Sequence, residues 1–89
     1  MRLSRKVPEL ATLVRKIVKG EGIEEWELRS GIRKRGVVRA RKLFCQIAVG
    51  RMGYPGAEVA RYLGVTTSAV NRLVVSEEVG DLEKYLKLF

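Results

Sequence analysis

Apolar residues recur at intervals of three and four along most of the chain, which is the spacing of one face of an α-helix. Pro8 favours a helix start at the beginning of the first such segment, and Gly20 and Gly22 favour its end. No segment alternates apolar and polar residues for long enough to predict a strand. The pattern therefore predicts an all-α fold. The apolar face of the first helix is expected to contain Val7, Leu10, Leu13, Val14, Ile17 and Val18.

The same spacing predicts further helices, separated by glycine-rich breaks. Trp26 is expected to anchor the second helix in the core, with Ile23 and Leu28 beside it. Asp81 is a candidate N-cap for the last helix, whose apolar residues are expected to cover the core or to form an oligomerisation face. The prediction is a compact bundle of five to six helices. The segments after the first are 23–30, 37–51, 56–63, 67–75 and 82–89, and the third has Ala40, Leu43, Phe44, Ile47 and Ala48 on its buried face.

The length of 89 residues predicts one domain spanning 1–89, with room for one modest core. The sequence has no histidine and one cysteine, Cys45, which is expected to be buried. These absences argue against histidine-based catalysis, a cysteine zinc cluster and an internal disulfide, so we expect no enzyme activity, no metal and no cofactor. No apolar run is long enough for a membrane span, and no small-molecule substrate is indicated. The single cysteine, and basic N-terminal residues that no uninterrupted apolar core follows, predict a protein of a reducing cytoplasm.

The charge of the chain is strongly positive and unevenly distributed. Eighteen Lys and Arg against ten Asp and Glu give a net charge of +8. The first 51 residues carry fourteen basic and five acidic side chains, whereas the remainder carries four basic and five acidic ones. The densest stretch, Arg29 to Lys42, contains seven basic residues and no acid. A basic domain of this kind indicates a polyanionic partner, most often nucleic acid.

Residues 56–75 have the pattern of a helix-turn-helix. Such a motif needs a small residue where its helices cross and a turn residue that tolerates a positive φ, which Ala60 and Gly64 supply. Val70 and Leu73 are spaced to hold the second helix against the first. Its opening hydroxyl residues can cap the helix or enter a major groove, and Asn and Arg further along suit adenine and guanine. The expected base-reading or phosphate-contacting residues are Thr66, Thr67, Ser68, Asn71 and Arg72.

The basic block just before this motif is expected to complete the DNA-binding surface. Arg33, Lys34 and Arg35 fall in a glycine-flanked loop, 31–36, from which they would reach the backbone or a minor groove. The block contains no acid to balance it, so it repels itself unless an anion is near. Arg39, Arg41 and Lys42 are expected near the start of the following helix, where a bound phosphate would favour them and they would clamp the DNA backbone.

The stretch from Arg33 to Val70 resembles the C-terminal DNA-binding domain of the bacterial replication initiator DnaA. It is similar in particular to the DnaA-like tail of proteins related to REP-associated tyrosine transposases. The residues that carry the resemblance are Arg39-Ala40-Arg41-Lys42-Leu43-Phe44-Cys45 and Ala57-Glu58-Val59-Ala60-Arg61-Tyr62-Leu63-Gly64-Val65-Thr66-Thr67-Ser68-Ala69-Val70.

The resemblance implies a helix-turn-helix bundle of the Trp repressor and DnaA type that binds double-stranded DNA in the bacterial cytoplasm, associated with the nucleoid. It implies a minor-groove contact for Arg33 and backbone contacts for Arg39 and Arg41. Thr66-Thr67-Ser68-Ala69 replaces the Asp-His-Thr-Thr signature of the family, so a different site preference is expected.

Three other functions remain open from the sequence. The first is a protein-interaction or homodimerisation module that uses the Leu82–Phe89 helix, residues 81–89 including its cap. The second is RNA binding, which the low aromatic content of 7% disfavours. The third is an accessory domain of a transposase-like enzyme, which would keep the DNA binding.

Overall fold

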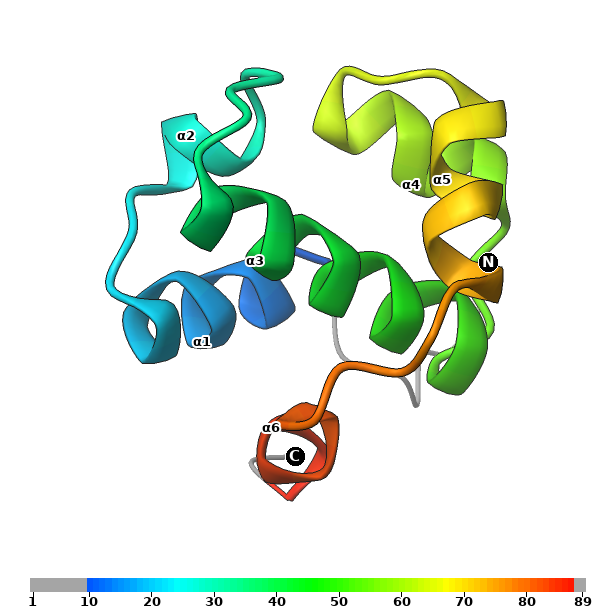
Figure 1. Ribbon diagram of the computed structural model, residues 1–89. Helices are drawn as coiled ribbons and strands as arrows, with labels where there is room; N and C mark the ends of the chain where they lie inside the picture. The colour runs from blue at the N-terminus through cyan, green and yellow to red at the C-terminus, as the bar shows by residue number, and fades with distance from the viewer. Residues whose placement is uncertain (1–9, 88–89) are drawn as a thin grey trace.

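The computed structural model describes residues 10–87 (Figure 1). α-Helices make up most of this part of the chain. No strand occurs within that range, which confirms the predicted all-α class. The start expected for the first helix, with Val7 and Pro8, lies outside the described residues. In chain order the elements are α1 Leu10–Glu21, α2 Glu25–Leu28, α3 Arg35–Cys45, the π-helical η1 Gln46–Arg51, α4 Gly56–Leu63, α5 Thr67–Val75 and α6 Leu82–Leu86.

The longest helical segment, α3 continued by η1, runs through the middle of the molecule (Figure 1). Helices α1 and α2 pack against α3, while α4 and α5 pack against each other, α5 also against α3, and both against η1. The segment ends at Arg51 as predicted but starts two residues before the expected Val37. Its expected inner face is fully buried. These core residues are Ala40, Leu43, Phe44, Ile47 and Ala48.

The second helix buries a different residue from the one expected. Trp26 is 61% exposed, whereas Leu28 is fully buried, so the prediction of a core Trp26 is wrong. Helix α2 contains only four residues, Glu25–Leu28. Positions two apart in a helix lie about 200° apart around its axis, so one turn cannot bury both side chains.

Helix α6 closes the core on the side of α1. Leu82 and Tyr85 are buried, and Leu86 packs half-buried against the same cluster, which confirms the expectation of core cover for these residues. Phe89, the last residue of the expected stripe, lies outside the described residues. None of the helices between residues 10 and 87 is both long and apolar enough to cross a membrane.

Cys45 is completely buried in α3, and this burial raises the pKa of its thiol to about 12. The thiolate is the reactive form, so Cys45 should resist alkylation in the folded protein. We expect iodoacetamide at pH 8 to leave the native protein unmodified over a time in which the protein in denaturant is fully labelled. Equal labelling rates in the two conditions would show that the thiol is accessible in the native state.

Candidate nucleic-acid interface

Helices α4 and α5 form the predicted helix-turn-helix, with bounds that match the expected 56–63 and 67–75. Gly64 ends α4 with a φ of 77°, which only glycine adopts at low cost, and its N–H donates to the Ala60 carbonyl at 2.9 Å. Val59 and Leu63 of α4 are buried in the same core cluster as Val70 of α5. The local turn signal and the apolar spacing therefore fix how the second helix lies on the first.

Thr66 provides the cap of α5 rather than a free hydroxyl. Its Oγ1 accepts a hydrogen bond from the Ala69 N–H at 3.0 Å, so it satisfies one of the amide groups at the helix start. Thr67 and Ser68 lie in the first turn of α5 and are exposed. One of the three expected hydroxyl residues therefore shapes the helix, and the other two face solvent.

The second turn of α5 adds Asn71 and Arg72, both exposed. The Asn71 carboxamide lies beside the start of α4, because a Cβ placed at Gly56 would be 2.9 Å from its Oδ1. Val75, missed from the sequence, continues this outward face and is 81% exposed. Its spacing of seven from Ser68 and three from Arg72 was the signal that could have placed it there.

The basic block is less free of acid than its sequence suggests. Three of its seven cations make ion pairs with carboxylates that the fold brings from outside the block. The expectation of an unbalanced block is therefore wrong for these three residues. The pairs are Arg29 with Glu25 at 3.3 Å, Lys34 with Glu27 at 3.3 Å, and Arg39 with Glu21 at 3.0 Å and with Asp81.

Arg39 connects three helices instead of standing free for phosphate. Its guanidinium donates to the carboxylates of Glu21 and Asp81, and the hydrogen bond with Glu21 raises the pKa of Arg39. The Tyr85 hydroxyl donates to the same Glu21 carboxylate at 2.6 Å. Asp81, expected to cap α6, makes no side-chain cap hydrogen bond and holds Arg39 instead. This network fixes α6 against α1 and α3.

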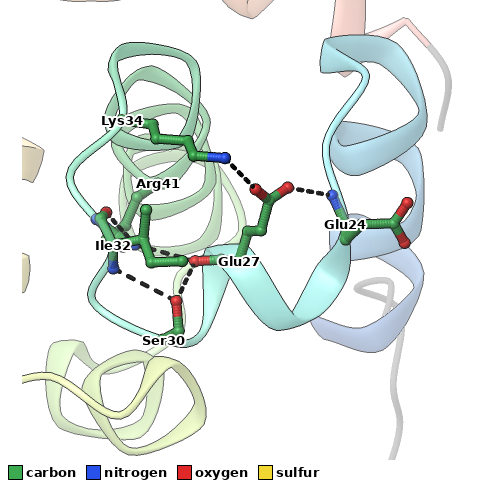
Figure 2. A network of polar contacts seen from close by, with 6 residues as sticks. All are labelled: Glu24, Glu27, Ser30, Ile32, Lys34 and Arg41. Atoms are coloured by element: carbon green, nitrogen blue, oxygen red, sulfur yellow. Dashed lines mark hydrogen bonds and ion pairs between the residues drawn. The ribbon is translucent and has the colours of Figure 1, made fainter.

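Arg41 is buried, which corrects the expectation that it clamps phosphate from the surface. Only 8% of the residue is exposed, and its Nε donates to the Leu28 carbonyl at 3.1 Å. Its Nη2 donates to the carbonyls of Glu27 and Ile32 (Figure 2). Burial lowers the pKa of Arg41, and the nearby Arg33 lowers it further. The Arg41 side chain thus connects α3 to the end of α2 and to the loop between α2 and α3, and holds that loop in place.

The helix position of these cations also differs from the expectation. Because α3 begins at Arg35, Arg39 is its fifth residue, and Arg41 follows two positions later. Lys42 lies in the last turn of α3 and is half-buried. The expectation that Arg39, Arg41 and Lys42 lie near the start of this helix, where a phosphate bound at its N-terminus would favour them, is therefore wrong.

The predicted loop 31–36 is wrong at its end, because Arg35 is the first residue of α3, and the basic loop between α2 and α3 consists of residues 29–34. This loop is held by a local hydrogen-bond network (Figure 2). The Glu27 carboxylate accepts from the Glu24 N–H at 2.9 Å and from Lys34, which lowers the pKa of Glu27. The Ser30 hydroxyl donates to the Glu27 carbonyl at 2.9 Å and accepts from the Ile32 N–H. Together with Arg41, these contacts give the basic loop a defined shape.

Arg29 fastens this loop to the helix-turn-helix. Its Nε donates to the Tyr62 carbonyl at 2.9 Å, and its guanidinium lies 4.3 Å from the centre of the Tyr62 ring. That ring stacks on Phe44 of α3, with 5.8 Å between the ring centres. The loop and helix α4 are therefore held in one arrangement by contacts with both main chain and side chain.

A buried glutamine, which the sequence analysis did not single out, fixes the other end of α5. The Gln46 Nε2 donates to the carbonyls of Leu73, Ser76 and Glu77 at 3.1–3.3 Å, and its Oε1 accepts from the Val79 N–H at 3.1 Å. Only 6% of Gln46 is exposed. One side chain of η1 thus contacts four main-chain groups, one in the last turn of α5 and three after its end. No sequence pattern distinguishes such a residue from an ordinary helical glutamine.

The face that remains open to a ligand combines α5 and part of the basic loop with Arg35 and Lys42 of α3, which line a hollow that shares Val38 with the one between the loop and α5. Of the cations expected at the DNA, Arg33, Arg35, Lys42 and Arg72 make no hydrogen bond or ion pair through their side chains to the residues between 10 and 87. Comparison of the chain with protein-family models, with curated proteins and with solved structures found no match. The functional conclusion therefore depends on the geometry of this face.

Proposed function

We propose that the chain binds double-stranded DNA, with α5 in the major groove and the loop of residues 29–34 at the neighbouring strand or minor groove. One observation carries this proposal. The exposed polar face of α5 and the unpaired Arg33 belong to parts that Arg29 and Tyr62 hold in one arrangement. A helix-turn-helix places the first turns of its second helix against base edges, and this is where Thr67 and Ser68 lie.

The exposed residues of α5 have side chains that suit contacts with bases or phosphates of DNA. Asn71 pairs with the edge of adenine, and Arg72 with guanine or a phosphate. Thr67 and Ser68 donate to bases or phosphates, and Val75 contacts a thymine methyl group. Thr66 contributes indirectly, because its cap fixes the start of the helix. The polar residues among these supply the sequence preference.

The unpaired cations of the proposed interface set the expected dependence of DNA affinity on salt. Arg33, Arg35, Lys42 and Arg72 can each neutralise one phosphate, and about four such contacts give a slope of log K against log salt near −4. Arg39 and Arg41 are left out of this number because carboxylates and carbonyls already hold them. Lys34 is left out because it pairs with Glu27.

We expect the protein to bind a randomised duplex pool at low salt, to prefer it over single-stranded DNA and duplex RNA, and to enrich one motif. Fluorescence anisotropy at several salt concentrations, followed by sequencing of the bound pool, measures all three properties. Asn71→Ala should relax the preference at one or two positions, and Lys42→Ala should weaken every sequence about equally. No binding at low salt would remove the proposal.

A matched control separates a defined interface from a general attraction to the net positive charge. Lys19 is an exposed cation on α1, where it lines a hollow with Lys84 and Tyr85, away from α5. Lys19→Ala removes the same unit of charge as Lys42→Ala and should leave binding within about twofold. If both substitutions cost the same, the attraction is not localised on the proposed face.

In the cell, the proposed DNA binding belongs to a replication-initiator-like or transposase-associated module of the bacterial nucleoid. The motif residues that resemble the DnaA domain support this role. The alternative function, homodimerisation through the apolar side of α6, is disfavoured because Leu82 and Tyr85 are buried within the chain and are not available to a partner. The genes that neighbour this one would distinguish replication from transposition, and sedimentation would detect a dimer.

A further inference from the structure

A cavity of about 380 Å³ lies between the basic loop and α5. We call it the arginine cavity, because three of its lining residues are arginines that come from the loop, from α3 and from α5. Its lining contains no carboxylate. The lining residues are Gly31, Arg33, Val38, Arg41, Val65, Ala69, Arg72 and Leu73.

The charges of the arginine cavity have no counter-charge in the described chain. Arg33 and Arg72 are exposed and make no hydrogen bond or ion pair within residues 10–87. The Nε and Nη2 of Arg41 donate hydrogen bonds to main-chain carbonyls, while its Nη1 makes no hydrogen bond to any residue between 10 and 87. Among the other cations of the block, Arg29, Lys34 and Arg39 have carboxylate partners, whereas Arg35 and Lys42 have none and line a different hollow.

The positive charges of the arginines in the cavity also repel one another. After burial, which is the main cause, the charge of Arg33 contributes to lowering the pKa of Arg41. Like charges around one concave space repel, and an anion between them would turn this repulsion into attraction. Arginine binds phosphate especially well, because its planar guanidinium offers parallel N–H groups to two oxygens.

The apolar lining of the cavity says more about the ligand than its charge does. Val38, Val65, Ala69 and Leu73 provide aliphatic surface next to the guanidinium groups. An isolated inorganic ion would leave that surface unused. A phosphate attached to a compact ring of low polarity, such as deoxyribose, would contact both parts of the lining.

We propose that the arginine cavity binds one sugar-phosphate unit of a DNA strand, with the phosphate between Arg33 and Arg72 and the deoxyribose on the aliphatic lining. This rests on the proposed function. A protein that occupies a major groove with α5 and the adjacent minor groove with a loop must hold the strand that separates the two grooves. The cavity lies between these two parts of the chain. Arg41 is a positioning residue, which holds the loop side of the cavity in place.

The first test is a double-mutant cycle on duplex binding, using the sequence enriched from the random pool. If Arg33 and Arg72 hold the same phosphate, we expect Arg33→Ala and Arg72→Ala each to lose about tenfold in affinity, and the double variant about twentyfold rather than a hundredfold. One methylphosphonate, which neutralises a single phosphate, should lose about tenfold with the wild-type protein and under twofold with the double variant. Additive losses, or no such position, would overturn the proposal.

The second test needs no DNA binding and therefore separates the two proposals. Deoxyribose 5-phosphate is titrated into the protein while the arginine Nε–H signals are followed by NMR, with deoxyribose and inorganic phosphate in parallel. We expect saturable shifts at Arg41 and Arg72 at millimolar concentration, with the sugar phosphate tighter than either part alone. The shift at Arg41, which both variants keep, should disappear in the Arg33→Ala, Arg72→Ala double variant and persist in Lys19→Ala.

The outcomes of the two tests divide clearly. A wild-type protein that ignores duplex DNA but binds deoxyribose 5-phosphate in the cavity would end the proposed function and keep a free sugar-phosphate site. A protein that binds duplex DNA without coupling between Arg33 and Arg72 would keep the function and end the cavity proposal. Inorganic phosphate binding as tightly as the sugar phosphate would contradict a role for the aliphatic lining.

Discussion

Gln46→Met is expected to lower the thermal unfolding midpoint by roughly 15 °C, which corresponds to about 3 kcal/mol for a domain of this size. Methionine has nearly the shape of glutamine and keeps the packing, so the loss reports the polar contacts. The carbonyls of Ser76 and Glu77 and the Val79 N–H would lose their side-chain partner in a site where only 6% of Gln46 is exposed, whereas the Leu73 carbonyl keeps the Ser76 hydroxyl. Buried polar groups without partners each cost about 1–3 kcal/mol. Calorimetry or circular dichroism measures the midpoint.

Ser76→Ala is the graded control for this prediction. The Ser76 hydroxyl donates to the Leu73 carbonyl at 2.7 Å, the same carbonyl that Gln46 reaches. Its loss removes one bond from a half-buried site, so about 1 kcal/mol is expected. Gln46→Met should also speed amide exchange in the last turn of α5. If Gln46→Met proved as mild as Ser76→Ala, Gln46 would not be what fixes this end of α5.

Gly20→Ala is expected to destabilise the protein by about 2 kcal/mol, although alanine is the better helix former. A Cβ at Gly20 would lie 2.1 Å from the Tyr85 hydroxyl oxygen and 2.7 Å from its Cε1. Tyr85 has little room to move, because it is buried and donates to Glu21. The added methyl group therefore pushes α6 away from α1. Urea unfolding measures the loss.

Gly36→Ala gives the opposite sign at a second helical glycine. It lies in the first turns of α3, and an added Cβ would meet nothing within 4 Å. A gain of up to about 1 kcal/mol is expected there from the helix preference of alanine. The cost of Gly20→Ala should shrink in a Tyr85→Leu background, where the ring is absent. A cost that does not change would show that the clash with Tyr85 is not its cause.

The elements that the sequence predicted best are those with local signals. Helices α4 and α5 match their expected bounds, because Gly64 stops the first and the Thr66 hydroxyl starts the second within a few residues. The buried faces of α3 and α6 also follow from apolar spacing alone. Trp26 was misplaced because a helix of four residues has too few turns for spacing to define an inner side.

The partners of the polar residues were beyond what spacing could predict. Arg39 finds Asp81, a residue 42 positions away, and Gln46 finds main-chain groups about 30 positions away. Arg41 turns inward to the carbonyls of Glu27 and Leu28 in α2 and of Ile32 in the following loop, which lie 9 to 14 positions before it. Five of the expected site residues are exposed on α5 or on the neighbouring basic loop, namely Thr67, Ser68, Asn71, Arg72 and Arg33. Their contact with DNA stays a prediction.

The contacts of Arg29 with Tyr62 have a consequence for the shape of the DNA target. They hold the basic loop and the helix-turn-helix at one separation, so the loop cannot adjust its reach as a flexible arm would. Each added base pair moves the two ends of a site apart by about 3.4 Å and rotates them around the helix axis by about 35°. In the proposed complex, a site tolerates no insertion between the bases that α5 reads and the groove that the loop reaches.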